Sequence, residues 1–90
     1  MRFTFILDHA GGSYIDQLNA LGVLSATRKY CLRLRESVAV PNGHLIASKF
    51  ELQLAEGASP VQLDGLIDAW CVGVVKVKGQ LGILNVVGSR

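Results

Sequence analysis

The chain has 90 residues, of which half are apolar and 18% charged, and its formal net charge is +2. This length suits one domain with a single core, residues 1–90. The charge is too small to predict nucleic-acid binding, and two cysteines are too few for a disulfide scaffold. The mean hydropathy of +0.37 exceeds what one small soluble domain needs. We therefore predict a homo-oligomer whose interface covers part of the apolar surface.

The apolar runs do not predict export or membrane insertion. Residues 3–7 are too few for a signal peptide, and no small-residue cleavage site follows them. Residues 72–87 are interrupted by Lys76 and Lys78, so they do not predict a membrane span. We expect a cytoplasmic protein with reduced thiols and no membrane contact.

The first expected elements are a strand over 2–8 and a short helix over 14–21. Phe3, Phe5 and Leu7 alternate with polar residues, which is typical of a strand. Ser13 has the character of a helix N-cap, and apolar residues then recur at helical spacing.

A β-hairpin is expected next, with strands over 28–36 and 44–54. Apolar and polar residues alternate in both segments. The intervening 41-PNG-43 is typical of a turn, because proline presets φ and Asn-Gly accepts positive φ.

A second helix is expected over 60–70, followed by two β segments over 72–87. Ser59, Pro60 and Gln62 fit a capped helix start, and apolar residues follow at i, i+3, i+4 and i+7. The last stretch alternates and turns at Gly79-Gln80. The order strand, helix, strand, strand, helix, strand predicts an α+β ferredoxin-like two-layer sandwich (βαββαβ), in which two helices cover one face of an antiparallel sheet, with an optional extra C-terminal strand.

The first third of the chain resembles the ACT-like regulatory domains, which are small βαββαβ modules. The resemblance rests on Asp8 at the end of the first strand, on Gly11 at the presumed helix entry, and on 21-LGVLSAT-27 before the second strand. The family's usual proline is Ala10 here, and Gly12 is an insertion. The resemblance implies association of sheets side by side and an amino acid or similar small molecule bound near Gly11.

The glycine turn between residues 8 and 13 has three interpretations. It could be only a corner that needs glycine, or a seat for a small anionic or zwitterionic ligand on backbone N–H groups at a helix start. It could also be a catalytic site with His9 as general base. The residues of this candidate ligand site are Asp8, His9, Gly11, Gly12 and Ser13.

Cationic side chains on the expected 28–36 strand form a second candidate site. Lys29, Arg33 and Arg35 share one strand face and could contact an anion or nucleic acid, although no aromatic ring accompanies them for base stacking. Cys31 lies among these cations, which would lower the pKa of an exposed thiol. A small residue covered by a dimer partner is the alternative. No metal site and no cofactor is predicted.

The leading hypothesis is a small, non-catalytic, homo-oligomeric module that binds a ligand or a protein and could be regulatory. One alternative is a small dimeric enzyme of the ferredoxin-like barrel type that uses His9. The other alternative is a nucleic-acid binder that uses the basic strand face.

Overall fold

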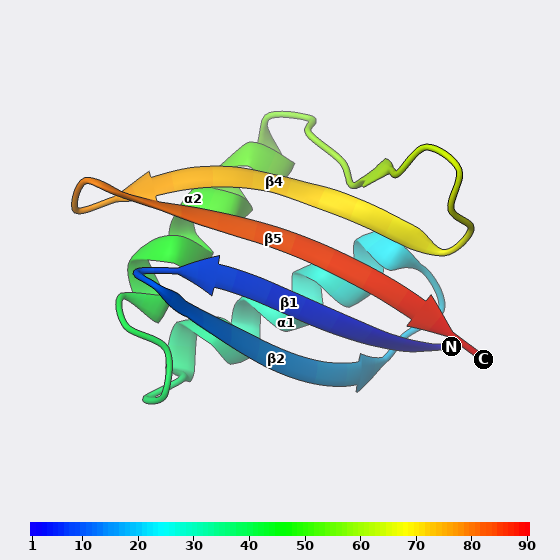
Figure 1. The fold of residues 1–90 in the computed structure, drawn as a ribbon, viewed down its shortest axis with the longest axis horizontal. Helices are drawn as coiled ribbons and strands as arrows, with labels where there is room; N and C mark the ends of the chain where they lie inside the picture. The colour runs from blue at the N-terminus through cyan, green and yellow to red at the C-terminus, as the bar shows by residue number, and fades with distance from the viewer.

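The computed structural model describes residues 1–90 as a five-stranded antiparallel sheet with two helices on one of its faces (Figure 1). The sheet order is β2-β1-β5-β4-β3. In chain order the elements are β1 (Arg2–His9), β2 (Gly12–Asn19), α1 (Val23–Glu36), α2 (Gly43–Ala55), β3 (Val61–Gln62), β4 (Ala69–Val77) and β5 (Gln80–Ser89). The α+β class, the antiparallel sheet and the two helices are confirmed, whereas the order ββααβββ differs from the predicted βαββαβ.

The glycine turn joins two strands and not a strand and a helix, so the helix expected over 14–21 is wrong. Ala10 and Gly11 both have positive φ (52° and 81°), as in the two-residue turns that match the twist of antiparallel strands. β2 then pairs with β1 along its whole length, from His9 opposite Gly12 to Arg2 opposite Asn19. Tyr14 and Leu18 fit both periods, although Asp16 on the helix side and Ile15 on the opposite side interrupt the alternation, and the two-residue turn places the segment beside β1 as a strand.

The segment expected as the first strand of a hairpin is helix α1. Its buried residues recur at helical spacing, and they are Ala26, Thr27, Tyr30, Cys31 and Leu34. Leu32, which alternation would bury, has 61% of its surface exposed. The helical pattern was hidden because its stripe begins before residue 28.

The second strand of the expected hairpin is helix α2. Pro41 and Asn42 do form a turn, but Asn42 adopts a left-handed conformation (φ 60°) and its carbonyl accepts the first bond of the helix from Ile46 N–H, at 2.9 Å. Gly43 permits a close approach to α1, because a Cβ there would lie 2.7 Å from the carbonyl oxygen of Leu34. The turn therefore connects antiparallel helices.

The capped helix expected over 60–70 is also absent. A turn at Asp64-Gly65, where Gly65 has φ 77°, interrupts the segment, and only the short β3 and the start of β4 are regular. Leu66 and Ile67 of the expected apolar stripe are exposed. The β segments expected over 72–87 are confirmed as β4 and β5, but the turn lies at Lys78 and Gly79, one residue before the predicted Gly79-Gln80, and both of its residues have positive φ.

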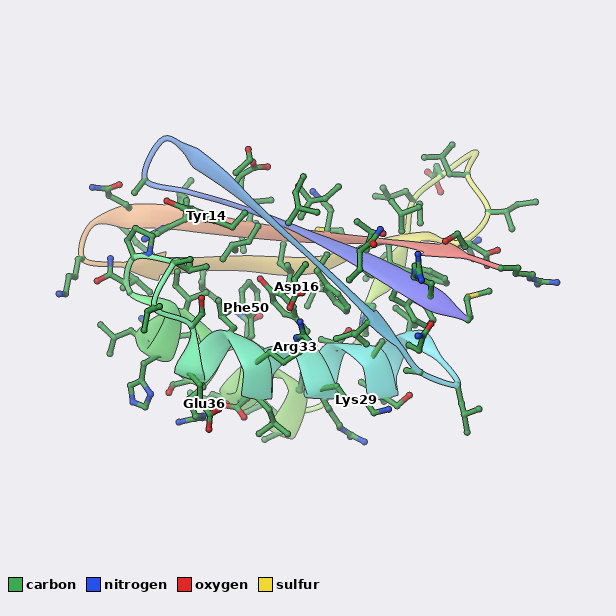
Figure 2. The ribbon with its side chains drawn as sticks, turned by 90° about the horizontal axis from the view of Figure 1, so that it is seen from below. Tyr14, Asp16, Lys29, Arg33, Glu36 and Phe50 are labelled. Atoms are coloured by element: carbon green, nitrogen blue, oxygen red, sulfur yellow. The ribbon has the colours of Figure 1, made fainter.

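One core lies between the sheet and the helices. It contains 17 buried residues, among them Phe3, Phe5 and Leu7 of β1 and Phe50 of α2. Figure 2 shows the two helices on one side of the sheet and no element packed over the middle of the other side. No helix is long and apolar enough to cross a membrane.

Candidate functional site

The largest hollow of the molecule is a groove between β2 and the C-terminal half of α1, with a volume of about 600 Å³. β2 is an edge strand of the sheet, so the groove lies where the sheet ends (Figure 1). Its lining comes from β2, α1 and the segment that links the helices, and consists of Ser13, Tyr14, Ile15, Asp16, Tyr30, Arg33, Leu34, Glu36, Ser37, Ala39 and Val40. We call it the β2–α1 groove.

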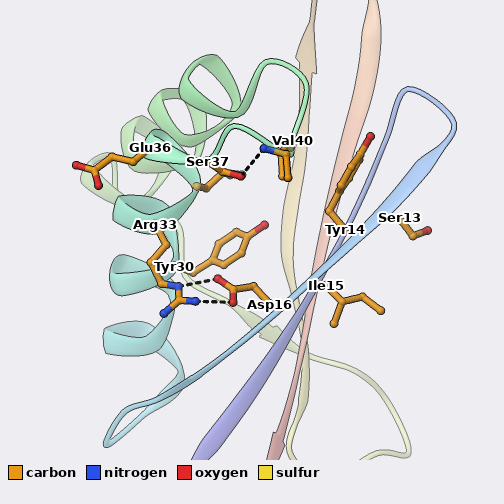
Figure 3. Close-up of a pocket in the computed structure, with 11 residues that line it drawn as sticks. Ser13, Tyr14, Ile15, Asp16, Tyr30, Arg33, Glu36, Ser37 and Val40 are labelled. Atoms are coloured by element: carbon orange, nitrogen blue, oxygen red, sulfur yellow. Dashed lines mark hydrogen bonds and ion pairs between the residues drawn. The ribbon is translucent and has the colours of Figure 1, made fainter.

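Two phenol rings face the β2–α1 groove from opposite sides. Tyr14 projects from β2 on the helix side of the sheet, and Tyr30 projects from α1 with its hydroxyl toward Tyr14 (Figure 3). Tyr30 stacks on Phe5, with ring centroids 4.4 Å apart, so the core fixes its position. Burial, and secondarily the Asp16 carboxylate, raise the pKa of Tyr30 well above its ordinary value. The phenol is therefore a neutral donor and acceptor at physiological pH.

An ion pair closes one end of the groove. The Nε and Nη2 of Arg33 donate to the two carboxylate oxygens of Asp16, each at 2.7 Å. This bidentate pair ties α1 to β2 below Tyr30, and Val40 stands at the other end (Figure 3). Glu36 is the one charged lining residue without an ion-pair partner, and it points away from β2 (Figure 3).

Along β2, residues whose backbone N–H and carbonyl groups bond to β1 alternate with residues whose groups face the free edge of the sheet. Ala20 and Met1 exchange N–H to carbonyl bonds, at 3.1 and 3.3 Å. Because bonded and non-bonded pairs alternate in an antiparallel ladder, the even-numbered residues of β2 bond to β1. The N–H and carbonyl groups of Ser13, Ile15, Gln17 and Asn19 therefore point away from the sheet.

Side chains occupy part of this free edge, but only in its second half. The N–H of Gln17 donates to Asp16 Oδ1 at 2.9 Å, and Lys29 Nζ donates to the carbonyl oxygen of Asn19 at 3.3 Å. No protein group occupies the outward N–H and carbonyl groups of Ser13 and Ile15. Both residues line the β2–α1 groove, so the open part of the edge and the groove coincide.

The residues predicted as a ligand site do come together, but around a hairpin. Asp8, His9, Gly11, Gly12 and Ser13 line a shallow hollow of about 300 Å³. The Ser13 hydroxyl donates to Asp8 Oδ1 across the two strands. Since no helix begins here, the proposed anion seat at a helix N-terminus is wrong.

His9, the catalytic candidate, is buried on the helix side of β1. Its Nδ1 lies 3.0 Å from the carbonyl oxygen of Leu81, and its Nε2 lies 3.3 Å from Nδ2 of Asn42. An Nδ1–H tautomer satisfies both contacts, by donating to Leu81 and accepting from Asn42. Both ring nitrogens are thus engaged in connecting β1 to β5 and to the start of α2.

The basic strand face does not exist, because its residues lie on a helix. Lys29 and Arg33 point toward β2, whereas Arg35 points toward α2 and pairs with Glu51. Cys31 is fully buried by this chain itself, and burial raises the pKa of its thiol to about 12; Glu51 adds to the rise and Arg35 opposes it. The thiol is thus protonated and shielded, so the condition for a reactive cysteine, exposure, is not met, and this chain's own core covers it without a dimer partner.

Sequence reasoning missed most of the β2–α1 groove. Of its residues, only Ser13 and Arg33 were candidates. The available signal was the alternation of Tyr14, Asp16 and Leu18, which an edge strand would present to a helix.

No group of three or more His, Cys, Asp or Glu side chains is arranged to hold a metal ion. No protein-family model, curated protein or solved structure matches this chain. The ACT-like resemblance therefore stays a prediction.

Proposed function

We propose that this protein is a non-catalytic protein-binding module that accepts an extended segment of a partner protein along the open half of the β2 edge. The segment adds a strand to the sheet, and its alternate side chains enter the β2–α1 groove. The observation that carries the proposal is the coincidence of the outward backbone groups of Ser13 and Ile15 with the groove they line.

The backbone groups supply part of the affinity. Two N–H donors and two carbonyl acceptors allow four hydrogen bonds, each of net value about 1 kcal/mol. That sum is smaller than the cost of association, so side chains must supply the rest. We therefore expect affinities on the order of micromolar.

The groove defines the side chains that fit. Half-buried Tyr14 and Val40 provide apolar and aromatic walls, the edges of buried Tyr30 and Leu34 form the floor, and the two phenols provide hydrogen-bonding groups. An apolar or aromatic side chain from the partner would fill the space between the two rings.

The alternative of an enzyme that uses His9 has less support. Both nitrogens of His9 already have partners, and neither histidine nor cysteine lines the β2–α1 groove. Asp16 is the carboxylate closest to Tyr30, and it is held by Arg33.

The test is selection of binding peptides from a random 12-residue library, followed by measurement of the selected peptides on the variant Ile15→Pro. Proline removes the outward N–H and places its ring where the added strand would lie. It leaves the bonds to β1 intact, because those belong to even-numbered residues, and prolines are tolerated at sheet edges. We expect at least a tenfold loss of peptide affinity with an unchanged circular dichroism spectrum.

The matched control is Ile15→Val, which keeps the N–H and should bind like the original chain. Leu52→Ala, on the outer surface of α2, should also leave binding unchanged. Selected peptides that bind Ile15→Pro as tightly as the original chain, or a library that yields no binder, would contradict the proposal.

A further inference from the structure

The face of the sheet opposite the helices carries exposed apolar side chains between polar ones such as Thr4, Gln17 and Asn85, and no element of this chain packs over it. Figure 2 shows this open face, with helices on the other side only. Its apolar side chains alternate with the core residues of four strands, and they are Ile6, Ile15, Cys71, Val74, Leu81, Ile83 and Val87. We call this set the open-face patch.

The strand register makes the open-face patch continuous. Ile15 lies directly opposite Ile6, and Ile83 lies directly opposite Val74. Ile6 pairs with Asn85, so Ile83 is its diagonal neighbour on the next strand. Ile15, Leu81, Val74 and Val87 are between 43% and 68% exposed, so this surface remains in water in the monomer.

An antiparallel sheet with one face in water ordinarily carries polar side chains there. A face with this many apolar residues is typical of one that packs against a second layer. Both helices of these 90 residues lie on the other face (Figure 2), so they supply no second layer over the open face.

We propose that the occupant is a second copy of this chain, with the two open faces packed against each other. Four strands about 4.8 Å apart and eight residues long cover about 19 by 27 Å, or on the order of 500 Å² per copy. Two copies would bury on the order of 1,000 Å² or more, which reaches the lower limit of specific interfaces. We therefore expect a dimer with a dissociation constant on the order of micromolar.

The charges on the open face are compatible with a second copy. Asp8 and Lys76 stand at the same end of this face, one on each side of the patch and with β5 between their strands, and Arg2 stands at the other end of β1. A strongly charged partner would find little to pair with across the patch. A second copy related by a two-fold axis can pair Asp8 of each copy with Lys76 of the other.

The test is sedimentation velocity of the full chain between 1 and 200 μM. We expect conversion from the 9.7-kDa monomer to a dimer over this range. The double variant Val74→Lys/Leu81→Glu leaves the net charge unchanged and should remain monomeric throughout. Its fold is checked by circular dichroism, and Glu at position 81 would lie opposite Lys76, which favours the folded sheet.

The matched control is Leu32→Lys/Leu52→Glu, which puts the same charges at similarly exposed leucines on the outer side of the helices. It should dimerise like the original chain. A second readout is alkylation of Cys71 by iodoacetamide in the original chain, because Cys71 lies in the patch and Cys31 is buried. Its rate should fall several-fold as the concentration rises to 200 μM.

A monomer at every concentration would overturn the proposal. A dimer that survives Val74→Lys/Leu81→Glu, or that the Leu32→Lys/Leu52→Glu control dissociates, would overturn it too. A Cys71 alkylation rate independent of concentration in a dimerising sample would also show that the dimer uses another surface.

Discussion

The first and second halves of β2 belong to one strand and one sheet edge, but their outward backbone groups have different surroundings. In the second half, Asp16 binds the N–H of Gln17 and Lys29 binds the carbonyl of Asn19. In the first half, Ser13 and Ile15 have no such partners. Open edges promote unwanted strand pairing, and proteins usually block them. The comparison indicates that side chains occupy one N–H and one carbonyl of the edge in the second half and none of the edge beside the β2–α1 groove.

Proline substitutions at adjacent positions of β2 should give the largest difference. Asp16→Pro removes an N–H that bonds to β1 and should destabilise the fold by about 3 kcal/mol or more, whereas Ile15→Pro should cost less than about 1 kcal/mol. Urea unfolding measures both values, and Asp16→Ala measures the part due to the lost carboxylate. Equal costs for the two prolines would mean that the bonding alternation assigned to β2 is wrong.

Alkaline pH should destabilise the fold through Tyr30 and Cys31, the two buried ionisable side chains of α1. Cys31 and Tyr30 both hold their protons in the folded chain beyond their ordinary pKa values, and for Cys31 the folded value is about 12. The unfolded chain releases these protons from about pH 9 for the thiol and about pH 10 for the phenol. The contribution of these two groups to the free energy of unfolding should therefore be fully present below pH 9, and the free energy of unfolding should decline as the pH rises toward 12.

Thermal unfolding as a function of pH measures this decline. The double variant Cys31→Ala/Tyr30→Phe lacks both groups, so its stability should depend less steeply on pH above 9, whatever its absolute stability. The same slope in the variant would assign the alkaline loss to other residues.

Removal of the Arg33–Asp16 ion pair should have the smallest effect on stability and should make the first and second halves of the β2 edge more alike. Arg33→Met breaks both bonds to Asp16, and because the pair is partly exposed we expect a cost of about 0.5–1 kcal/mol. Freed Asp16 should hold the N–H of Gln17 less well, so hydrogen exchange of that amide should accelerate. Arg28→Met, on the same helix and without an ion-pair partner, is the control. Unchanged exchange at Gln17 would show that the Arg33–Asp16 ion pair does not support the hydrogen bond from the Gln17 N–H to Asp16.

Sequence reasoning succeeded where one pattern had no competitor. Phe3, Phe5 and Leu7 alternate without a helical alternative, and the strand they predict is β1. The final two strands were also predicted, and the turn between them to within one residue, because lysines and glycine separate two alternating runs there.

The interior of the chain could not be predicted in the same way, because short apolar segments fit both periods. Tyr30 and Leu34 satisfy alternation and helical spacing equally, and only Ala26 and Thr27, outside the segment considered, favour the helix. Gly65 argued against a helix over 60–70, but the Ser-Pro start suggested one. The β2–α1 groove followed these errors, since it exists only once residues 12–19 are a strand and residues 23–36 are a helix.

The most direct test of strand addition is an NMR titration of the ¹⁵N-labelled protein with a selected peptide. Strand addition predicts downfield shifts and slowed hydrogen exchange for the amides of Ser13 and Ile15, and NOEs between their backbone protons and those of the peptide. The amides of Tyr14 and Asp16, which already bond to β1, should be protected before the peptide is added. Shifts confined to the β4 and β5 residues of the open-face patch or to residues 57–68, with Ser13 and Ile15 still exchanging freely, would contradict the proposed function.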